Sequence, residues 1–163
     1  MESLLERARR IRLLVLDVDG VLTDGRLYIS SDGEEFKVFD VRDGSGLVAA
    51  RRAGIDIAII SGRRSAAVER RAAELGIDHV EQGVRDKGPV FDALLKGTGF
   101  SRAQAACVGD DTPDLPMLER AGLAIAVADA HADVRKVVDW VTSLPGGRGA
   151  VREVCDLLLS ARR

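Results

Sequence analysis

The sequence predicts an α/β fold in which helices flank a parallel sheet, and three observations support this prediction. From about residue 40 onward, short apolar runs alternate with helical segments, which is the pattern of βαβ units with right-handed crossovers. Several apolar runs consist almost entirely of Leu, Ile, Val and Ala, as expected for strands that a parallel sheet buries on both faces. Acids or hydroxyls follow several of these runs, and open α/β sheets bind ligands at that edge.

The individual elements follow from these periodicities and from the residues that end them. The predicted strands are 13–16, 55–60, 78–81, 105–108, 123–127 and 140–141. The predicted helices are 65–75, 89–96, 113–121, 131–137 and 150–161. Gly76 and Gly97 directly follow the first two of these helices, where glycine commonly ends a helix. Ser101 and Gln104 have the spacing of a capping box, which predicts a short helical turn.

One segment interrupts the alternation and predicts a β-hairpin. Runs of β-forming residues at 27–29 and 35–39 flank a polar stretch that contains Asp32-Gly33, a pair typical of hairpin turns. Because the segment closely follows the first strand, we expect the hairpin to overhang the end of that strand. A helix is then expected to begin at Gly44.

Length and composition limit the possible classes of protein. We expect residues 1–163 to form a single domain, since a chain of this length can bury one core. The 24 basic and 26 acidic residues nearly balance, which argues against binding to nucleic acid or to a membrane surface. The sequence has no apolar stretch of the ~18 residues that span a membrane and no signal-peptide core, so a cytoplasmic location is expected. Cys107 and Cys155 are expected to be buried small hydrophobic residues rather than disulfide partners.

Acidic residues follow two of the predicted strands. Asp17 and Asp19 come directly after the first strand, and in extended backbone two side chains at this spacing share one face. Asp110, Asp111 and Asp114 follow the strand at 105–108. Taken alone, an acid followed by glycine is also typical of an ordinary turn. Two acidic clusters at strand ends favour a ligand site instead.

The order of the motifs extends this pattern. D-x-D at 17–19 is followed by Ser-Gly at 61–62, by Lys87 in a helical segment, and by G-D-D-x-x-D at 109–114. A chain with these motifs in this order resembles the haloacid dehalogenase superfamily, and the resemblance covers about residues 11–160. It implies a Rossmann-like parallel sheet with the hairpin as a flap over the site. The chain has no room for the cap domain of larger members, so the resemblance implies a capless protein that assembles as a homotetramer.

The resemblance implies that the site transfers a phosphoryl group. Asp17 would be the nucleophile that becomes an aspartyl-phosphate, and Asp19 the general acid that protonates the leaving oxygen and then serves as the base for water. The Ser61 hydroxyl and the Gly62 amide would hold the phosphoryl oxygens. Lys87 would neutralise charge on the phosphate and on the nucleophile.

The resemblance also implies a Mg²⁺ ion. Neighbouring carboxylates and a phosphate repel one another, and Mg²⁺ prefers oxygen ligands. Asp17 and Asp110 would supply carboxylate oxygens, and Asp19 its backbone carbonyl. Three roles remain open for Asp111 and Asp114: they could be metal ligands, partners of the ligands, or acids that stabilise a helix N-terminus.

Three segments point to a narrower group within the superfamily. The stretches 39–44, 127–131 and 146–159 resemble members that act on 3-deoxy-D-manno-octulosonate 8-phosphate, a phosphorylated sugar acid on the route to lipopolysaccharide. Arginine pairs well with the carboxylate of such a substrate, so Arg63 and Arg71 are expected to face it. A solvated helix charge is the alternative for Arg71. The substrate-binding residues that the resemblance implies are Asp19, Asp40, Val41, Arg42, Asp43, Gly44, Gly62, Arg63, Arg71, Lys87 and Arg148.

Other interpretations stay open at this stage. The glycines around Arg148 are typical either of a flexible connector or of a tail that reaches a neighbouring subunit's site. The substrate could instead be 2-keto-3-deoxy-nononate 9-phosphate, whose phosphatases tend to have an acid at the position of Arg63. A non-catalytic oligomerisation domain is a further possibility, against which the complete set of motif residues argues.

Overall fold

The computed structural model describes residues 2–163, and a six-stranded parallel sheet forms its centre. The strands lie in the order β5-β4-β1-β6-β7-β8. Their bounds are β1 Leu13–Leu16, β4 Asp56–Ile60, β5 His79–Glu81, β6 Ala105–Gly109, β7 Leu123–Ala126 and β8 Trp140–Val141. The predicted strands and the α/β fold class are therefore confirmed, with shifts of single residues at some strand ends.

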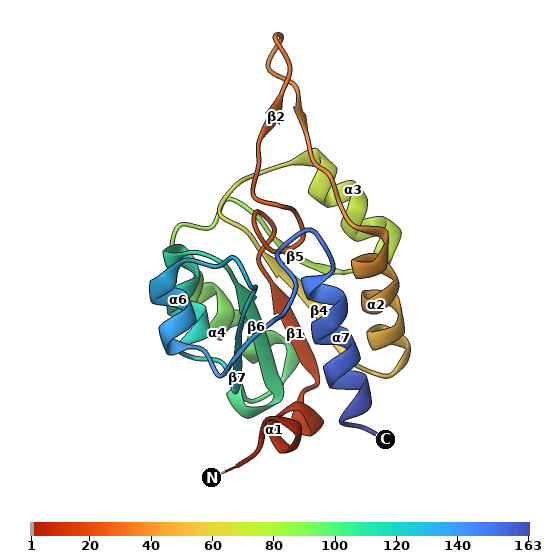
Figure 1. Ribbon diagram of the computed structural model, residues 1–163, viewed down its shortest axis with the longest axis vertical. Helices are drawn as coiled ribbons and strands as arrows, with labels where there is room; N and C mark the ends of the chain where they lie inside the picture. The colour runs from red at the N-terminus through yellow and green to blue at the C-terminus, as the bar shows by residue number, and fades with distance from the viewer. Residues whose placement is uncertain (1) are drawn as a thin grey trace.

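Helices cover both faces of the sheet (Figure 1). On one face α2 packs against α7 and α3, while α4 and α6 lie on the other face, where α4 also contacts α5. The helices are α1 Leu4–Arg10, α2 Val41–Arg52, α3 Ala66–Leu75, α4 Lys87–Thr98, α5 Leu115–Leu118, α6 Ala132–Val137 and α7 Ala150–Ser160. This two-sided covering explains why the strands are nearly continuous apolar runs.

Side-chain caps explain where two of the helices begin. α2 starts earlier than the predicted Gly44, because Asp40 is its N-cap and accepts the amide hydrogen of Arg42. α1 was not predicted, although Ser3 and Glu6 form a capping box at its start. Both corrections follow from polar residues whose side chains replace missing backbone partners at a helix N-terminus.

Two predicted helices have other bounds in the structure. α4 runs through Gly97 to Thr98, and the residue that caps it is Gly99, whose φ of 79° is left-handed. The acidic segment after β6 forms a 3₁₀ turn at Thr112–Asp114 and then only the short α5, rather than a helix over 113–121. The predicted capping box at 101–104 is confirmed at the start of another 3₁₀ turn.

The register of the sheet explains why the motif residues meet. Leu16, the last residue of β1, pairs with Ile59 in β4 and with Val108 in β6, so these strands end side by side. The amide of Asp17 continues the pairing by donating to the carbonyl of Val108 at 3.2 Å. The acids after β1 and β6 and the Ser-Gly pair after β4 therefore share one edge of the sheet.

The predicted hairpin is confirmed. Its strands are β2 (Tyr28–Ile29) and β3 (Glu35–Phe36), which pair in antiparallel fashion. Gly33 supplies the left-handed residue of the turn with a φ of 88°. The hairpin projects beyond the body of the molecule, at the end opposite both chain termini (Figure 1). We call it the flap.

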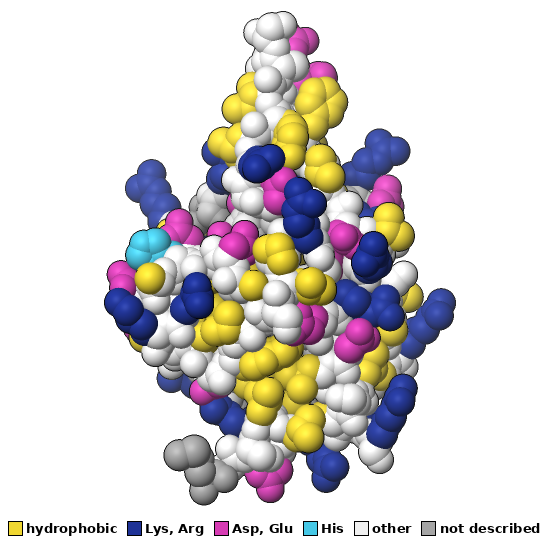
Figure 2. Space-filling model, in the orientation of Figure 1, with side chains coloured by type: hydrophobic (Ala, Val, Ile, Leu, Met, Phe, Trp, Pro, Cys, Tyr) yellow, Lys and Arg dark blue, Asp and Glu magenta, His cyan; other side chains and the backbone are white. Residues whose placement is uncertain are grey.

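The second arm of the flap turns its charged side inward. Glu35 and Lys37 are partly buried, whereas the side chains of Phe36 and Val38 are 56% and 58% exposed. Figure 2 shows apolar side chains gathered along the projecting hairpin. This alternation is the reverse of the usual one for a solvent-facing ribbon, in which polar side chains point outward.

Both cysteines belong to the core, as predicted. Cys107 in β6 and Cys155 in α7 are fully buried and free. Burial raises the pKa of both thiols, so they stay protonated and unreactive at neutral pH. Within residues 2–163, no helix has the length and apolar character needed to cross a membrane.

Candidate active site

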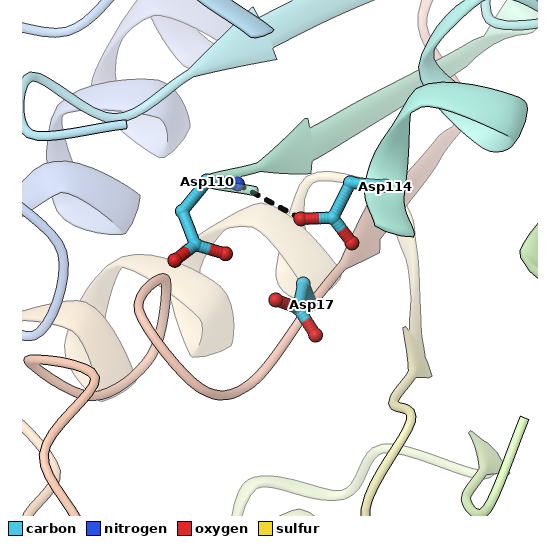
Figure 3. A group of neighbouring side chains, drawn as sticks. All are labelled: Asp17, Asp110 and Asp114. Atoms are coloured by element: carbon cyan, nitrogen blue, oxygen red, sulfur yellow. Dashed lines mark hydrogen bonds between the residues drawn. The ribbon is translucent and has the colours of Figure 1, made fainter. Parts of the chain in front are cut away.

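Three carboxylates converge at the edge where β1 and β6 end. Asp17 follows β1, Asp110 follows β6, and Asp114 lies in the 3₁₀ turn before α5; their side chains point toward one another (Figure 3). One oxygen of each lies within 4.8 Å of the others. Burial raises the pKa of Asp17 and of Asp110, and neighbouring carboxylates raise both further. The cluster is therefore a concentrated negative charge with little access to water.

Lys87 balances part of this charge. Its ammonium donates to Oδ1 of Asp17 at 2.8 Å and to Oδ1 of Asp114 at 2.7 Å. Burial acts to lower the pKa of Lys87, but the two carboxylates outweigh it and raise that pKa overall, so the ammonium is charged at neutral pH. Asp86 fixes the start of α4 by accepting the amide hydrogen of Gly88, which places Lys87 at the first helical position.

Asp114 organises the site from within the protein. Its Oδ1 accepts from Lys87, and its Oδ2 accepts the backbone amides of Asp110 at 2.9 Å and of Asp111 at 3.2 Å. Although Asp114 lies close enough to share an ion with the other two acids, both of its oxygens already have partners. This geometry favours a role in holding the ligands rather than direct ligation. Asp111 is exposed and caps the 3₁₀ turn through the amide of Thr112.

Glycine lets the loop after β1 approach its neighbours closely. A Cβ at Gly20 would overlap the carboxylate of Asp110, and the φ of Gly20 is +87°. A Cβ at Gly146 would overlap the carbonyl oxygen of Gly20, and the amide of Gly147 donates to the carbonyl of Val21 at 3.0 Å. The glycine-rich segment before α7 is thus packed at these positions against the loop that follows β1, and it is not a free connector.

A carboxylate from another loop holds the same glycine-rich segment. Asp129 accepts the amide hydrogen of Gly146 at 3.0 Å. Two residues further along, the amide of His131 donates to the carbonyl of Asp110 at 2.7 Å. The loop after β7 therefore supports the glycine-rich segment through a side chain and the acidic loop after β6 through a backbone contact.

The donor set fits a small divalent cation. Asp17 and Asp110 offer hard carboxylate oxygens at the required closeness, and such ligands suit Mg²⁺. Three carboxylates face the single ammonium of Lys87, so the cluster keeps a negative charge that a cation would neutralise. Neutralisation would also remove the repulsion that raises the pKa of these acids.

Asp19 is bound to the flap. Its Oδ1 accepts from Nζ of Lys37 at 2.7 Å, and the same ammonium donates to Glu35 at 2.8 Å. The second oxygen of Glu35 accepts from Arg63 at 3.0 Å, and Nε of Arg63 lies 4.0 Å from Oδ2 of Asp19. We call these four residues the flap network. Lys37 and then Arg63 hold the pKa of Glu35 below its usual range, so Glu35 is ionised between these two cations.

The structure divides the predicted site residues into groups. One pocket is lined by the predicted residues Asp17, Asp19, Gly62, Arg63, Lys87 and Asp110. A separate cavity is lined by the predicted residues Asp40, Asp43, Gly44 and Arg71. Ser61 is buried directly after β4. The remaining predicted residues are exposed and line neither pocket: Val41, Arg42 and Arg148.

Asp43 has a structural partner in α7. It is buried, and its Oδ1 accepts the amide hydrogen of Arg152 at 2.9 Å. It thereby caps a helix whose own N-cap, Gly149, has no side chain. The other oxygen of Asp43 is buried without a hydrogen-bond partner among the described residues, and burial raises the pKa of Asp43 to about 6.

Arg71 packs between α2 and α3. Its guanidinium lies 5.9 Å from the centre of the Phe39 ring and donates to Glu74 at 3.3 Å. It fills the space beside Gly44, where a Cβ would overlap it. Arg71 is therefore neither a freely solvated helix charge nor part of the pocket that contains Lys87.

Sequence reasoning missed several residues that matter here. Glu35 and Lys37 are two positions apart in an arm of the hairpin, so their side chains share a face. The apolar residues between and beside them lie on the other face. This alternation of charged and apolar residues could have predicted that the charged face is turned toward the site. The support by Asp129 and the capping of α7 by Asp43 join residues far apart in the chain, and no local pattern predicts them.

Comparison with known proteins gives a consistent result. Residues 80–151 match a family model described as haloacid dehalogenase-like hydrolase. The chain is 50% identical over 160 residues to the 3-deoxy-D-manno-octulosonate 8-phosphate phosphatase of Escherichia coli (strain K12), covering 98% of this chain and 85% of that protein. It is 47% identical over 161 residues to the protein of the same name in Yersinia pestis, covering 99% of this chain and 86% of that one.

Solved structures agree with the sequence comparison. One is the crystal structure of the phosphatase of this name from Moraxella catarrhalis in complex with magnesium ion, phosphate ion and KDO molecule. It has a TM-score of 0.95 and 46% identity, and the match covers 97% of this chain and 91% of that one. The crystal structure of the Yersinia pestis protein also has a TM-score of 0.95, with 48% identity and coverage of 97% and 85%.

Proposed function

The chain belongs to the 3-deoxy-D-manno-octulosonate 8-phosphate phosphatases of the haloacid dehalogenase superfamily, and we propose that it hydrolyses this phosphate ester on the route to lipopolysaccharide. The observation that carries the proposal is the pocket in which Asp17, Lys87 and Asp110 meet and which Arg63 also lines. An acidic cluster that fits a cation suits a phosphate, and a guanidinium suits the carboxylate of the sugar acid.

In the first step Asp17 is the nucleophile. One of its carboxylate oxygens bonds to phosphorus, while the ester P–O bond breaks and leaves its electron pair on the sugar oxygen. Asp19 gives its proton to that oxygen, so the sugar acid departs as an alcohol. Lys87 keeps the nucleophile oriented through the 2.8 Å hydrogen bond to Oδ1 and neutralises negative charge as the phosphoryl group approaches.

In the second step water replaces the enzyme on phosphorus. Asp19, now ionised, takes a proton from the attacking water, and the bond between phosphorus and Asp17 breaks. Phosphate leaves, and both carboxylates return to their starting states. The hydroxyl of Ser61 and the amide of Gly62 are assigned to the phosphoryl oxygens, since both follow β4 at the edge where the acids meet.

Mg²⁺ is the cofactor, in agreement with the magnesium ion in the Moraxella relative and with the donor set of the site. The carboxylates of Asp17 and Asp110 and the backbone carbonyl of Asp19 would hold it. When bound, the ion supplies positive charge that offsets the repulsion between the acids and the phosphate.

The nucleophile and the metal can be tested together. Asp17→Asn keeps the shape of the side chain but removes the attacking charge, so phosphate release should fall to background; EDTA should abolish activity and added Mg²⁺ should restore it. Asp78→Asn, at an exposed position, is the matched control and should retain full activity. Full turnover by Asp17→Asn or by EDTA-treated enzyme would refute the mechanism.

Substrate choice is tested by comparing two esters. The rate of phosphate release from 3-deoxy-D-manno-octulosonate 8-phosphate should exceed that from 2-keto-3-deoxy-nononate 9-phosphate. A preference for the nononate ester would leave the phosphatase mechanism intact but overturn the substrate assignment.

The partner that we propose is a second copy of this chain, in a homotetramer. The flap turns large apolar side chains to solvent, among them Ile29 at 60% and Phe36 at 56% exposure, and exposed apolar patches mark interfaces. Covering this face would also shield a pocket that has no cap domain. Light scattering should give the tetramer mass at micromolar concentration, and Phe36→Ser should weaken assembly; a stable wild-type monomer would contradict the proposal.

We further propose that residues 1–163 act as one domain in the cytoplasm. A single main sheet and one core cluster contain elements from both halves of the chain. The buried free thiols fit a reducing compartment. One cooperative unfolding transition, and recovery of the protein in the cytoplasmic fraction, are the expected results.

A further inference from the structure

Lys37 lies on the flap, yet its ammonium is buried against Asp19 in the loop after β1, which we call the catalytic loop. The side chain is 3% exposed, and Nζ lies 2.7 Å from Asp19 and 2.8 Å from Glu35. A lysine on a projecting hairpin normally keeps its charged end in water. Burying an ammonium costs free energy unless carboxylates pair it, and here two of them do. The position of this ammonium is therefore set by the protein.

The contact leaves one oxygen of Asp19 anchored and the other available. Oδ1 accepts from Lys37, whereas Oδ2 lies 4.0 Å from Nε of Arg63, beyond hydrogen-bonding distance. Asp19 also lines the pocket that contains Asp17. A carboxylate held through one oxygen has a restricted orientation, and its second oxygen can deliver a proton in a fixed direction.

The anchor comes from the flap and is itself supported. Glu35 holds Lys37 from the opposite side and is held in turn by Arg63, which follows β4. Glu35 and Lys37 face inward along this arm, while the apolar Phe36 and Val38 face outward. We propose that Lys37 is a positioning residue that orients the carboxylate of Asp19 toward the leaving oxygen. The proposal rests on the function and the roles of Asp17 and Asp19 proposed above.

The chemical step makes this role testable. As an oxygen of Asp17 bonds to phosphorus, the ester P–O bond breaks, its electron pair stays on the leaving oxygen, and the proton of Asp19 passes to that oxygen. An alkoxide leaving group needs this proton, whereas nitrophenolate is stable without it. Misplacing Asp19 should therefore slow alkyl phosphates much more than p-nitrophenyl phosphate.

The experiment measures kcat/KM for a series of esters with Mg²⁺: the octulosonate phosphate, glycerol phosphate, phenyl phosphate and p-nitrophenyl phosphate. The value of kcat/KM depends on the steps from substrate binding up to and including departure of the leaving group. Lys37→Met should lower kcat/KM about ten- to hundredfold for the alkyl esters and less than about threefold for p-nitrophenyl phosphate. Lys37→Arg, which keeps a positive charge, should retain most of the wild-type kcat/KM for the alkyl esters. Lys96→Met, which changes an exposed lysine of α4, should behave as the wild type.

Two results would overturn the inference. Equal losses on all esters would mean that Lys37 supports the flap or the fold as a whole, and unchanged kinetics would mean that Asp19 needs no anchor. Thermal unfolding of both Lys37 variants checks that they fold. A wild-type enzyme that releases phosphate from none of the esters would instead overturn the proposed function, so the two failures are distinguishable.

Discussion

Lys87→Met is the most informative perturbation of the site, because it removes charge but little volume. In the wild type the ammonium pairs with Asp17 and Asp114 at 2.8 and 2.7 Å, and the three side chains are 3%, 10% and 2% exposed. The variant would leave two buried carboxylates without their cation, next to Asp110. Because water cannot solvate these carboxylates, their charge destabilises the folded state.

The size of the effect follows from this burial. Removing one partner of a buried ion pair costs about 3–5 kcal/mol. For a protein of this length each kcal/mol lowers Tm by about 2–4 °C, so we expect a decrease of about 6–20 °C at pH 8. The loss should be smaller at pH 5. Burial raises the pKa of Asp17 to about 6, and Lys87 holds it from rising further. Without the ammonium this pKa rises, so Asp17 takes up a proton as the pH falls from 8 to 5 and its repulsion with Asp114 weakens.

Calorimetry of metal-free protein at pH 5 and pH 8 measures this effect. Lys96→Met is the matched control, and its unfolding free energy should change by less than about 1 kcal/mol. Lys87→Met combined with Asp114→Asn should recover part of the stability, since the double variant removes one of the uncompensated charges. A decrease in Tm no larger than that of the control, or a loss independent of pH, would show that the ammonium does not stabilise the cluster.

Other substitutions test separate parts of the structure. Arg63→Ala should lower kcat/KM for the octulosonate phosphate roughly ten- to hundredfold, since hydrogen bonds to charged groups contribute about 1.5–3 kcal/mol; an equal loss on p-nitrophenyl phosphate would refute carboxylate recognition. Gly146→Ala should reduce turnover because its Cβ would overlap the catalytic loop, whereas Gly97→Ala, which meets open space, should retain activity. The pKa of Asp43 is raised to about 6, so wild-type stability should fall as pH rises from about 4 to about 6 and stay lower above it. Asp43→Asn should make that decrease smaller by about 3 kcal/mol, while the raised pKa of Asp17 still contributes to it; urea unfolding of both proteins across this range measures the difference.

The parts of the site that the sequence predicted correctly are those with a local cause. Asp17 and Asp110 end up together because parallel strands in register end at one edge, and an apolar run followed by an acid reveals each strand end. Lys87 was predicted to lie in a helical segment, and the side-chain cap by Asp86 explains why α4 begins at this residue rather than at the predicted residue 89. The hairpin was visible from its turn residues.

The parts that were not predicted depend on contacts between distant segments. Lys37 could have been a solvated surface lysine, and only the folding of the flap over the catalytic loop brings it to Asp19. Asp43 was predicted as a substrate-binding residue, and its capping of α7 through one oxygen, which depends on the packing of α2 on α7, was not predicted. Helix ends were misplaced at Gly44 and Gly97 because glycine is compatible with both a helix and its end.

The sequence by itself determined the α/β fold class, the strand order along the chain, and which acids at strand ends meet at one edge of the sheet. It could do so because hydrophobic periodicity and strand-end residues act over a few positions. Only the tertiary structure decided the orientation and partners of these groups: Asp114 toward Lys87 and two amides, Asp19 toward the flap, and the glycine-rich segment against Gly20. Charge pairing and close packing are set by the distance between atoms in space, and the spacing of residues along a chain does not specify that distance.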